Sequence, residues 1–240
     1  MPGEPKPPPR RDLRLPGRPA ASRFVAKLDA MSPYWEPQLI VAAALLLDLA
    51  LPSRLTIGPS WLLPAVEGLL LVGLGIASPR PMFRHSALRR YVALTLIALV
   101  SAVNLFSLVL LTHYLLHGSV ENGRELVFSG IALWGTNVLL FGLWFYELDR
   151  GGPVARALNQ EHYPDFLFVQ MTDAEPFSPP GWKPRLIDYL YTSFTNATAF
   201  SPTDTMPLTS NAKWLMSIQA LGSLVTIGLV VARAVNILQG

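Results

Sequence analysis

The sequence predicts an all-α fold: an integral membrane helical bundle with about five transmembrane helices and one short re-entrant or interfacial helix. Two observations carry this prediction. Only 15% of the 240 residues are charged, whereas soluble domains usually carry about a quarter. The charged residues also gather in blocks, and the stretches between the blocks are long and apolar, which is typical of a chain that crosses a bilayer repeatedly.

Residues 1–35 are expected to be a disordered basic tail followed by an interfacial segment. The tail is rich in Pro and Arg, and it has too few apolar side chains to offset the entropy that is lost on ordering. Tyr34 and Trp35 suit the headgroup region of a bilayer. No apolar core precedes residue 38, so we expect no cleavable signal peptide.

Residues 36–150 are expected to form a bundle of four spans. The apolar stretches place these spans at about residues 38–51, 61–77, 91–116 and 126–146. The first span is short, because a hydrocarbon core of ~30 Å requires roughly 20 helical residues. Asn104 and Asn137 fall near the centres of the third and fourth spans, where their amides can hydrogen-bond to each other.

The distribution of Lys and Arg predicts a multi-pass protein of the cell membrane with a cytoplasmic N-terminus. The N-terminal tail is basic, and the loop between the second and third spans holds Arg80, Arg84, Arg89 and Arg90 but no acid. This orientation and contact with anionic lipid explain the net charge of +3. The lipid bilayer is therefore an expected partner, and nucleic acid is not.

Residues 151–184 are expected to be an irregular extramembrane loop. Gly151, Gly152 and Pro153 end the fourth helix, and the further prolines of this segment argue against a second folded domain. The apolar run at residues 166–169 is expected to lie against the bundle.

Residues 185–240 form the most informative segment, in which we expect a pore-loop-like helix, a loop and a final span at about residues 212–238. The helix that begins at Leu186 is apolar and aromatic, but it is too short to cross a bilayer before Pro202. It must therefore turn back within the membrane or lie at the interface. The loop after it, TNATAFSPTDT, is rich in hydroxyls. Non-helical backbone at membrane depth is tolerated only where it is buried in protein or lines a water-filled cavity.

This order of elements resembles the pore module of potassium channels, in which an aromatic-Ser-Phe-Thr helix end precedes the filter T-V-G-Y-G-D, a P-x-T string and a long helix. The matching residues are YTSFT at 191–195, Thr198 where the filter begins, Asp204 where it ends, Pro207 and Thr209. The resemblance implies a homo-oligomer, a tetramer in a channel of this kind, and a monovalent cation as the permeating ion. It also implies a pore loop lined or stabilised by Thr195, Thr198, Phe200, Ser201, Thr203 and Asp204, with Asp204 supplying a ring of charge.

The filter itself departs from the potassium-channel pattern, because TAFSPTD is one residue longer and has neither glycine. Glycine reaches the positive-φ conformations that a ladder of inward carbonyls requires, whereas the φ of Pro202 is fixed. We therefore expect an ion-channel-like protein that is a weakly selective or non-conducting cation channel. The alternative is a structural or scaffolding membrane protein without transport, in which the loop connects two helices and Asp204 or Thr209 caps the second.

The whole chain also resembles a group of uncharacterised bacterial membrane proteins of the actinobacterial type, which share the strings ELDRGGP and SFTNATAFSPTDTMPLT. In the final span, Gly222 and Gly228 permit close helix packing, either within the chain or in an oligomer.

No sequence motif indicates an enzyme, a cofactor or a metal site. The chain has no cysteine, which excludes disulfides, thiol nucleophiles and cysteine-ligated metals. It also lacks the G-x-S-x-G and H-E-x-x-H patterns of hydrolases and zinc proteases. His113 and His117 share a helix face, but such a pair is typical of the polar end of a span.

Overall fold

The computed structural model describes residues 36–52, 55, 65, 68–69, 72, 87–117, 123–157, 163–172, 182–198 and 205–238. The expected N-terminal tail and interfacial segment at residues 1–35 lie outside this part of the chain. So does most of the expected second span at residues 61–77.

The described residues are mainly helical, as expected for an all-α protein. The helices after residue 86 are α3 (Ala87–His117), α4 (Gly123–Leu148), α5 (Pro153–Ala157), α6 (Leu186–Ala197) and α7 (Ser210–Leu238), with short 3-10 turns η2 (Asp149–Gly151) and η3 (Val169–Met171). An earlier helix covers residues 36–49. Three stretches in this described part are long and apolar enough to cross a membrane: Arg90–Leu115, Val127–Gly151 and Ser210–Ala232. They coincide with the third, fourth and last expected spans, and they are compatible with a membrane protein.

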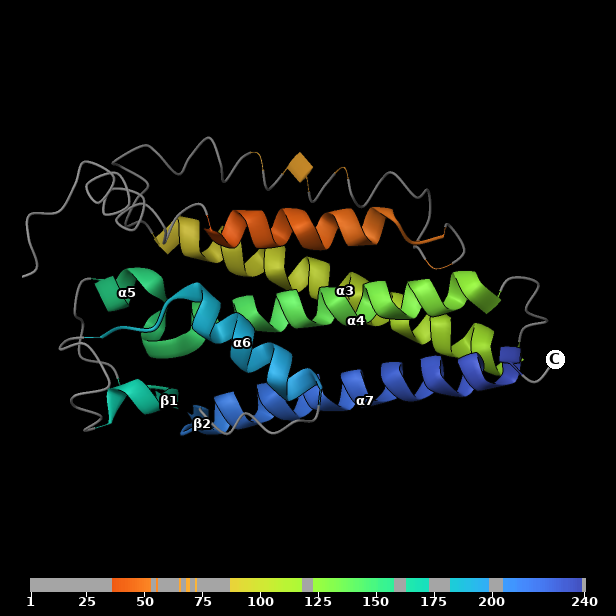
Figure 1. Cartoon of the computed structure of the whole chain (residues 1–240). Helices are drawn as coiled ribbons and strands as arrows, with labels where there is room; N and C mark the ends of the chain where they lie inside the picture. Colours follow the sequence, from red (N-terminus) through yellow and green to blue (C-terminus); the bar gives the residue numbers. More distant parts are fainter. Residues whose placement is uncertain are drawn as a thin grey trace, which may run out of the picture. The chain divides into compact units, whose positions relative to one another are not determined.

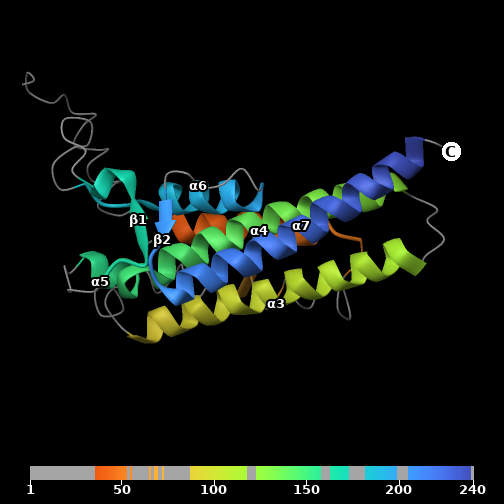
Figure 2. The ribbon, with the colours of Figure 1, turned by 90° about the horizontal axis from the view of Figure 1, so that it is seen from below.

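Two short strands add a feature that the helical pattern did not predict. Strand β1 (Phe166–Phe168) pairs with β2 (Thr205–Pro207) in an antiparallel ladder, with Phe166 opposite Pro207 and Phe168 opposite Thr205. The pair joins the expected loop at residues 151–184 to the segment just before α7 (Figures 1 and 2). Phe166 and Phe168 are buried, so this apolar run does lie against the bundle.

Helix α4 is the central element, since it contacts α3, α6 and α7 (Figure 2). It is antiparallel to α3, because Trp144 near the end of α4 donates to the hydroxyl of Ser101 in the first half of α3, at 3.0 Å. It is also antiparallel to α7, because Gly130 near the start of α4 contacts Val230 near the end of α7. Helices α3 and α7 therefore run in the same direction, and they also contact each other.

The core is aromatic near the end of α4 and aliphatic farther along the bundle. The ring of Phe166 packs against that of Phe145 at a centroid distance of 5.0 Å and against that of Tyr189 at 6.3 Å. At the other end, Leu51, Leu55, Leu111 and Leu133 form a separate buried cluster.

The two asparagines expected to pair across the third and fourth spans do not bond to each other. The side-chain nitrogen of Asn104 donates to the carbonyl of Leu133 at 3.2 Å, and that of Asn137 donates to the hydroxyl of Ser223 at 2.8 Å. Both amides do join helices, as expected, but the rotation of α4 directs Asn137 toward α7 rather than toward α3.

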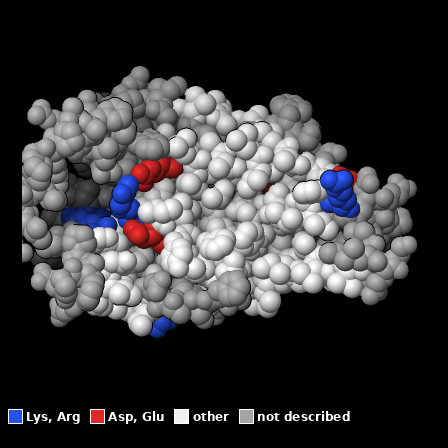
Figure 3. All heavy atoms as spheres, viewed as in Figure 1, with Lys and Arg blue, Asp and Glu red and all other residues white. Residues whose placement is uncertain are grey.

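The outer surface of the long helices is apolar. Leu105 on α3 is 62% exposed and Leu221 on α7 is 67% exposed, and many other large apolar side chains on these helices are exposed in the same way. On the face shown in Figure 3, the charged side chains of the described residues gather toward the two ends, and the surface between them is almost entirely uncharged. An apolar surface of this extent marks contact with lipid or with another protein.

Gly142 allows α6 to approach α4 closely, and this contact can be tested. A Cβ at Gly142 would lie 2.6 Å from Cδ2 and 3.2 Å from Cα of Leu190, so the backbone of α6 would have to move. We expect Gly142→Ala to lower the free energy of unfolding by ~1–3 kcal/mol, the usual cost of overpacking. Denaturant titration in detergent measures this change.

Gly228→Ala is the matched control, because a Cβ at Gly228 meets no heavy atom within 4 Å. Because Ala has a higher helix propensity than Gly, this substitution should leave the free energy of unfolding unchanged or raise it by up to ~1 kcal/mol. Equal losses of stability from both substitutions would contradict the close contact between Gly142 and Leu190.

Candidate functional site

The candidate site is the C-terminal hairpin of α6, β2 and α7, and it begins with a capped but short helix. The backbone N–H of Arg185 donates to Oδ2 of Asp188 at 2.7 Å, which fixes the first turn of α6. The helix has 12 residues and is therefore about 18 Å long at 1.5 Å per residue. A hydrocarbon core is ~30 Å thick, so α6 cannot cross it.

The contacts of α6 show that it runs in the same direction as α7. Its first turn lies beside the end of α4, where Tyr189 contacts Phe166. Its last turn lies beside the third turn of α7, where Asn196 donates to the carbonyl of Met216 at 2.9 Å and to Oε1 of Gln219 at 2.8 Å. The strand β2 that precedes α7 lies back beside the middle of α6. The hydroxyls of Thr192 and Thr205 are 3.1 Å apart. Helix α6 therefore runs away from the end of α4, β2 lies back near the start of the hairpin, and α7 runs in the same direction as α6 (Figure 2).

A buried polar cluster attaches α6 to both of its neighbours. Ser193 donates to the carbonyl of Val138 on α4 at 2.6 Å. Nε2 of Gln219 on α7 donates to the hydroxyl of Ser193 at 2.6 Å and to its carbonyl at 2.9 Å. Ser193 and Gln219 are fully buried, where hydrogen bonds are strong and unmade bonds are costly.

The expected pore-loop residues divide into two described and four undescribed positions. The hydroxyl of Thr195 donates to the carbonyls of Tyr191 and Thr192, both at 3.0 Å. The hydroxyl of Thr198 donates to those of Phe194 at 3.1 Å and Thr195 at 3.0 Å. Both hydroxyls thus bond to the last turns of α6. The remaining four positions lie outside the described residues: Phe200, Ser201, Thr203 and Asp204.

The two glycines expected to mediate helix packing face open space within this chain. A Cβ at Gly222 or at Gly228 would meet no heavy atom within 4 Å. Close approach occurs instead at two glycines of α4, where Gly130 contacts Val230 and Gly142 contacts Leu190. The packing role of Gly222 and Gly228 in an oligomer stays a prediction.

The base of the hairpin is built on the carboxylate of Asp149, whose side chain is 0% exposed. Its Oδ1 accepts the backbone N–H of Asp165 at 2.8 Å and that of Phe166 at 3.4 Å. Its Oδ2 accepts the hydroxyl of Tyr189 at 2.5 Å. One carboxylate thereby joins the end of α4, the start of β1 and the first turn of α6.

Arg156 supplies the positive charge that Asp149 requires. Nη1 of Arg156 lies 4.0 Å from Oδ2 of Asp149 and donates to the carbonyls of Tyr146 and Asp149, both at 2.7 Å. Its guanidinium lies over the rings of Tyr146 and Tyr189, at 4.6 and 5.3 Å from their centroids. A buried charge is tolerated only when it is paired and hydrogen-bonded in this way.

An unusual turn after α4 places the Asp149 carboxylate. Three consecutive residues have positive φ: Arg150 at 52°, Gly151 at 76° and Gly152 at 96°. Glycine adopts this region without strain, whereas Arg150 does so at some cost. The backbone N–H of Arg150 donates to Oδ2 of Asp165 at 3.1 Å, which helps to hold the turn.

A second carboxylate, Asp165, extends the cluster to α7. Its Oδ1 accepts the hydroxyl of Thr209 at 2.6 Å, and its carbonyl accepts the N–H of Leu208 at 2.8 Å. The hydroxyl of Thr209 in turn accepts the N–H of Ala212 at 3.3 Å, which makes Thr209 an N-cap of α7. The sequence offered Thr209 as one of two possible caps, but it gave no role to Asp149 or Asp165.

The contacts of the Asp149 cluster join α4, β1 and α6 to one another. Burial raises the pKa of Tyr189 above its ordinary value, the Arg156 guanidinium lowers it in part, and the Asp149 charge raises it further. The hydroxyl therefore stays protonated and keeps donating to Asp149. Among the residues that the structure describes, no three His, Asp or Glu side chains come together where they could hold a metal ion.

Comparisons with protein families, with characterised proteins and with solved structures found no match to this chain.

Removing the Tyr189 hydroxyl tests the link between α6 and α4. We expect Tyr189→Phe to lower the free energy of unfolding by ~1–3 kcal/mol, because it leaves a buried carboxylate one donor short. Denaturant titration in detergent measures the loss. Tyr191→Phe on the same helix is the matched control. Tyr191 is 52% exposed, and its loss of a hydroxyl should change stability by less than ~0.5 kcal/mol. Equal effects at the two positions would contradict the assigned role of Asp149.

Proposed function

We propose that this chain is a multi-pass protein of the cell membrane whose segment α6–β2–α7 is the re-entrant pore loop of an ion-channel-like protein. The observation that carries the proposal is the direction of the hairpin: α6 and α7 run the same way, and the chain returns between them. A helix of about 18 Å that enters a bilayer and turns back delivers its loop to roughly the middle of the hydrocarbon core. Irregular backbone at that depth needs protein or water around it.

The bundle supports five spans. The helix over residues 36–49 and α3 both begin at the end of the bundle where α6 begins. Arg185 lies 3.9 Å from Glu36 at this end, and a Cβ at Gly152 would lie 3.7 Å from Nε of Arg90. Two parallel helices in sequence need a return crossing between them, and the apolar stretch at residues 61–77 is long enough to supply it.

The end at which the hairpin enters holds several arginines among a similar number of acids, and the positive-inside rule counts Lys and Arg rather than net charge. Arg90, Arg150, Arg156 and Arg185 lie near the start of α3, the end of α4 and the start of α6. By the positive-inside rule this end is cytoplasmic, together with the N-terminus. The hairpin therefore enters from the cytoplasm, which is the inverse of a potassium channel.

Conduction in this proposal requires an oligomer, because one copy of a pore loop cannot enclose a channel. In a tetramer, the loop with Phe200, Ser201, Thr203 and Asp204 surrounds the axis, and the Asp204 ring attracts monovalent cations. The filter has no glycine, so the discrimination between K⁺ and Na⁺ is weak.

A second candidate is a scaffolding membrane protein without transport. One observation favours it: the polar side chains of α6 that face the bundle bond within the same chain. Ser193, Asn196 and Gln219 bond to one another and to backbone carbonyls of α4 and α7. A hairpin of this kind is stable without a second copy.

Flux measurements separate the two candidates. The protein is reconstituted in liposomes with an outward K⁺ or Na⁺ gradient, and its oligomeric state is measured in the same detergent. We expect an oligomer that passes both ions at similar rates. Asp204→Asn should lower the flux several-fold by removing the ring of charge.

Asp173→Asn is the control for Asp204→Asn, because it removes a carboxylate from the expected extramembrane loop and should leave the flux unchanged. A strict monomer with no flux would eliminate the channel and leave the scaffold.

The absence of cysteine makes orientation directly testable, since a single introduced thiol is the only one in the chain. We expect Ser119→Cys, between the third and fourth spans, to react with a membrane-impermeant maleimide in intact cells. Ser178→Cys should react only after lysis. The opposite pattern would place the hairpin entrance outside, as in potassium channels.

A further inference from the structure

An apolar groove runs between α3 and α7 on the outer face of the bundle. Its volume is about 570 Å³, and its walls are mainly aliphatic side chains: Leu105, Leu108, Val109, Ile218, Leu221 and Val225. Most of these side chains are strongly exposed. The groove lies within two of the stretches that are long enough to cross a membrane, so lipid is its natural surrounding.

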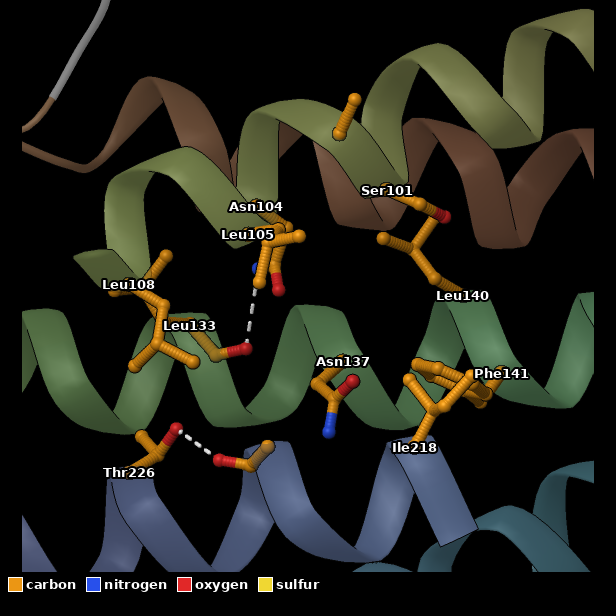
Figure 4. A pocket seen from close by; sticks show the side chains of 12 residues that line it. Ser101, Asn104, Leu105, Leu108, Leu133, Asn137, Leu140, Phe141, Ile218 and Thr226 are labelled. Atoms are coloured by element: carbon orange, nitrogen blue, oxygen red, sulfur yellow. Dashed lines mark hydrogen bonds between the residues drawn. The ribbon is translucent and has the colours of Figure 1, made fainter. Parts of the chain in front are cut away.

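A smaller cavity of about 210 Å³ adjoins the groove on its inner side (Figure 4). Leu105, Leu108, Ile218 and Gly222 line both spaces. The cavity reaches α4, where buried Leu133 and Leu140 form its floor. An engineered apolar cavity of ~150 Å³ holds benzene, so this one can take the end of a chain molecule.

The cavity differs from the groove in having two amides on its wall. The side-chain nitrogens of Asn104 and Asn137 are engaged by the carbonyl of Leu133 and the hydroxyl of Ser223. The oxygen of Asn104 points into the space between α3 and α4, whereas the amide of Asn137 lies between α4 and α7 (Figure 4). No Asp, Glu, Lys or Arg is among the described residues that line either space.

We propose that the groove and the cavity together bind one uncharged single-chain lipid with a terminal hydroxyl. The hydroxyl donates its one hydrogen to the amide oxygen of Asn104, and the hydrocarbon chain lies along α3 and α7. A hydroxyl in the hydrocarbon core is costly unless it is hydrogen-bonded, so an acceptor at this depth selects for it. Among the described lining residues, the one ionisable side chain is His113, which lies in the groove and not in the cavity. A carboxylate has no hydrogen to donate to the Asn104 oxygen, so the cavity disfavours fatty acids. This site requires membrane insertion but does not require conduction.

Photolabelling tests the site with defined probes. The full-length protein is placed in liposomes of phosphatidylcholine and phosphatidylglycerol with a diazirine analogue of hexadecanol, and labelled peptides are located by mass spectrometry. We expect saturable labelling of α3 and α7 that unlabelled hexadecanol displaces. The matching diazirine alkane should label about two- to tenfold more weakly, which corresponds to about one hydrogen bond. A diazirine fatty acid should not compete.

Two glycine variants locate the site. Gly222 lines both spaces, and a Cβ there meets nothing, so Gly222→Leu fills the site without a clash at Cβ. It should lower labelling by about tenfold or more, as expected when ~1.4 kcal/mol or more of binding is lost. Gly228→Leu has equal room but lines neither space, and it should label as the wild type does. Asn104→Leu should abolish the preference for the alcohol over the alkane.

Three results would overturn the proposal. Non-saturable labelling, spread evenly over the exposed helix faces, would show ordinary contact with bulk lipid. Equal labelling by alcohol and alkane in the wild type would remove the role of the Asn104 amide. An equal loss in both glycine variants, together with loss of an oligomer, would show that this face joins copies of the chain.

Discussion

The C-terminal half of the structure depends on one buried charge, the carboxylate of Asp149. It accepts donors from β1 and α6, it is balanced by Arg156, and it stands where α4 ends. Removing a partner from such a site leaves an uncompensated charge away from water, which is far more costly than losing a surface ion pair. The direction of α6, and with it the whole hairpin, follows from where this carboxylate holds Tyr189.

The polar contacts farther along α6 depend on the position of its first turn. With its first turn fixed by Asp149, α6 lies along α4 at Gly142, and its hydroxyl face meets Gln219 on α7. The outward face is left apolar, as on α3 and α7. The side-chain hydrogen bonds thus lie between helices, and apolar side chains cover the outer surface of the bundle. A lipid solvent favours this distribution.

The sequence predicted the parts that depend on local pattern. Long apolar stretches predicted α3, α4 and α7, and the early Pro202 predicted that α6 would be short. It did not predict the partners of Asn104 and Asn137, because hydropathy gives the depth of a residue but not the rotation of its helix. The role of Asp149 was missed for a related reason: its partners Asp165 and Tyr189 lie 16 and 40 positions away. Strands of three residues give too short an alternation to be recognised.

The end of α6 has an electrostatic consequence. A helix carries about half a negative charge at its C-terminus, from carbonyls that no backbone N–H reaches. Here that terminus lies beside Met216 and Gln219 of α7, and in the proposed re-entrant arrangement the low permittivity of the bilayer would strengthen its field. The hydroxyl of Thr198 reaches only the carbonyls of Phe194 and Thr195 among those of the last turn. The macrodipole of α6 therefore favours cations over anions beside its C-terminus, whatever residues follow it.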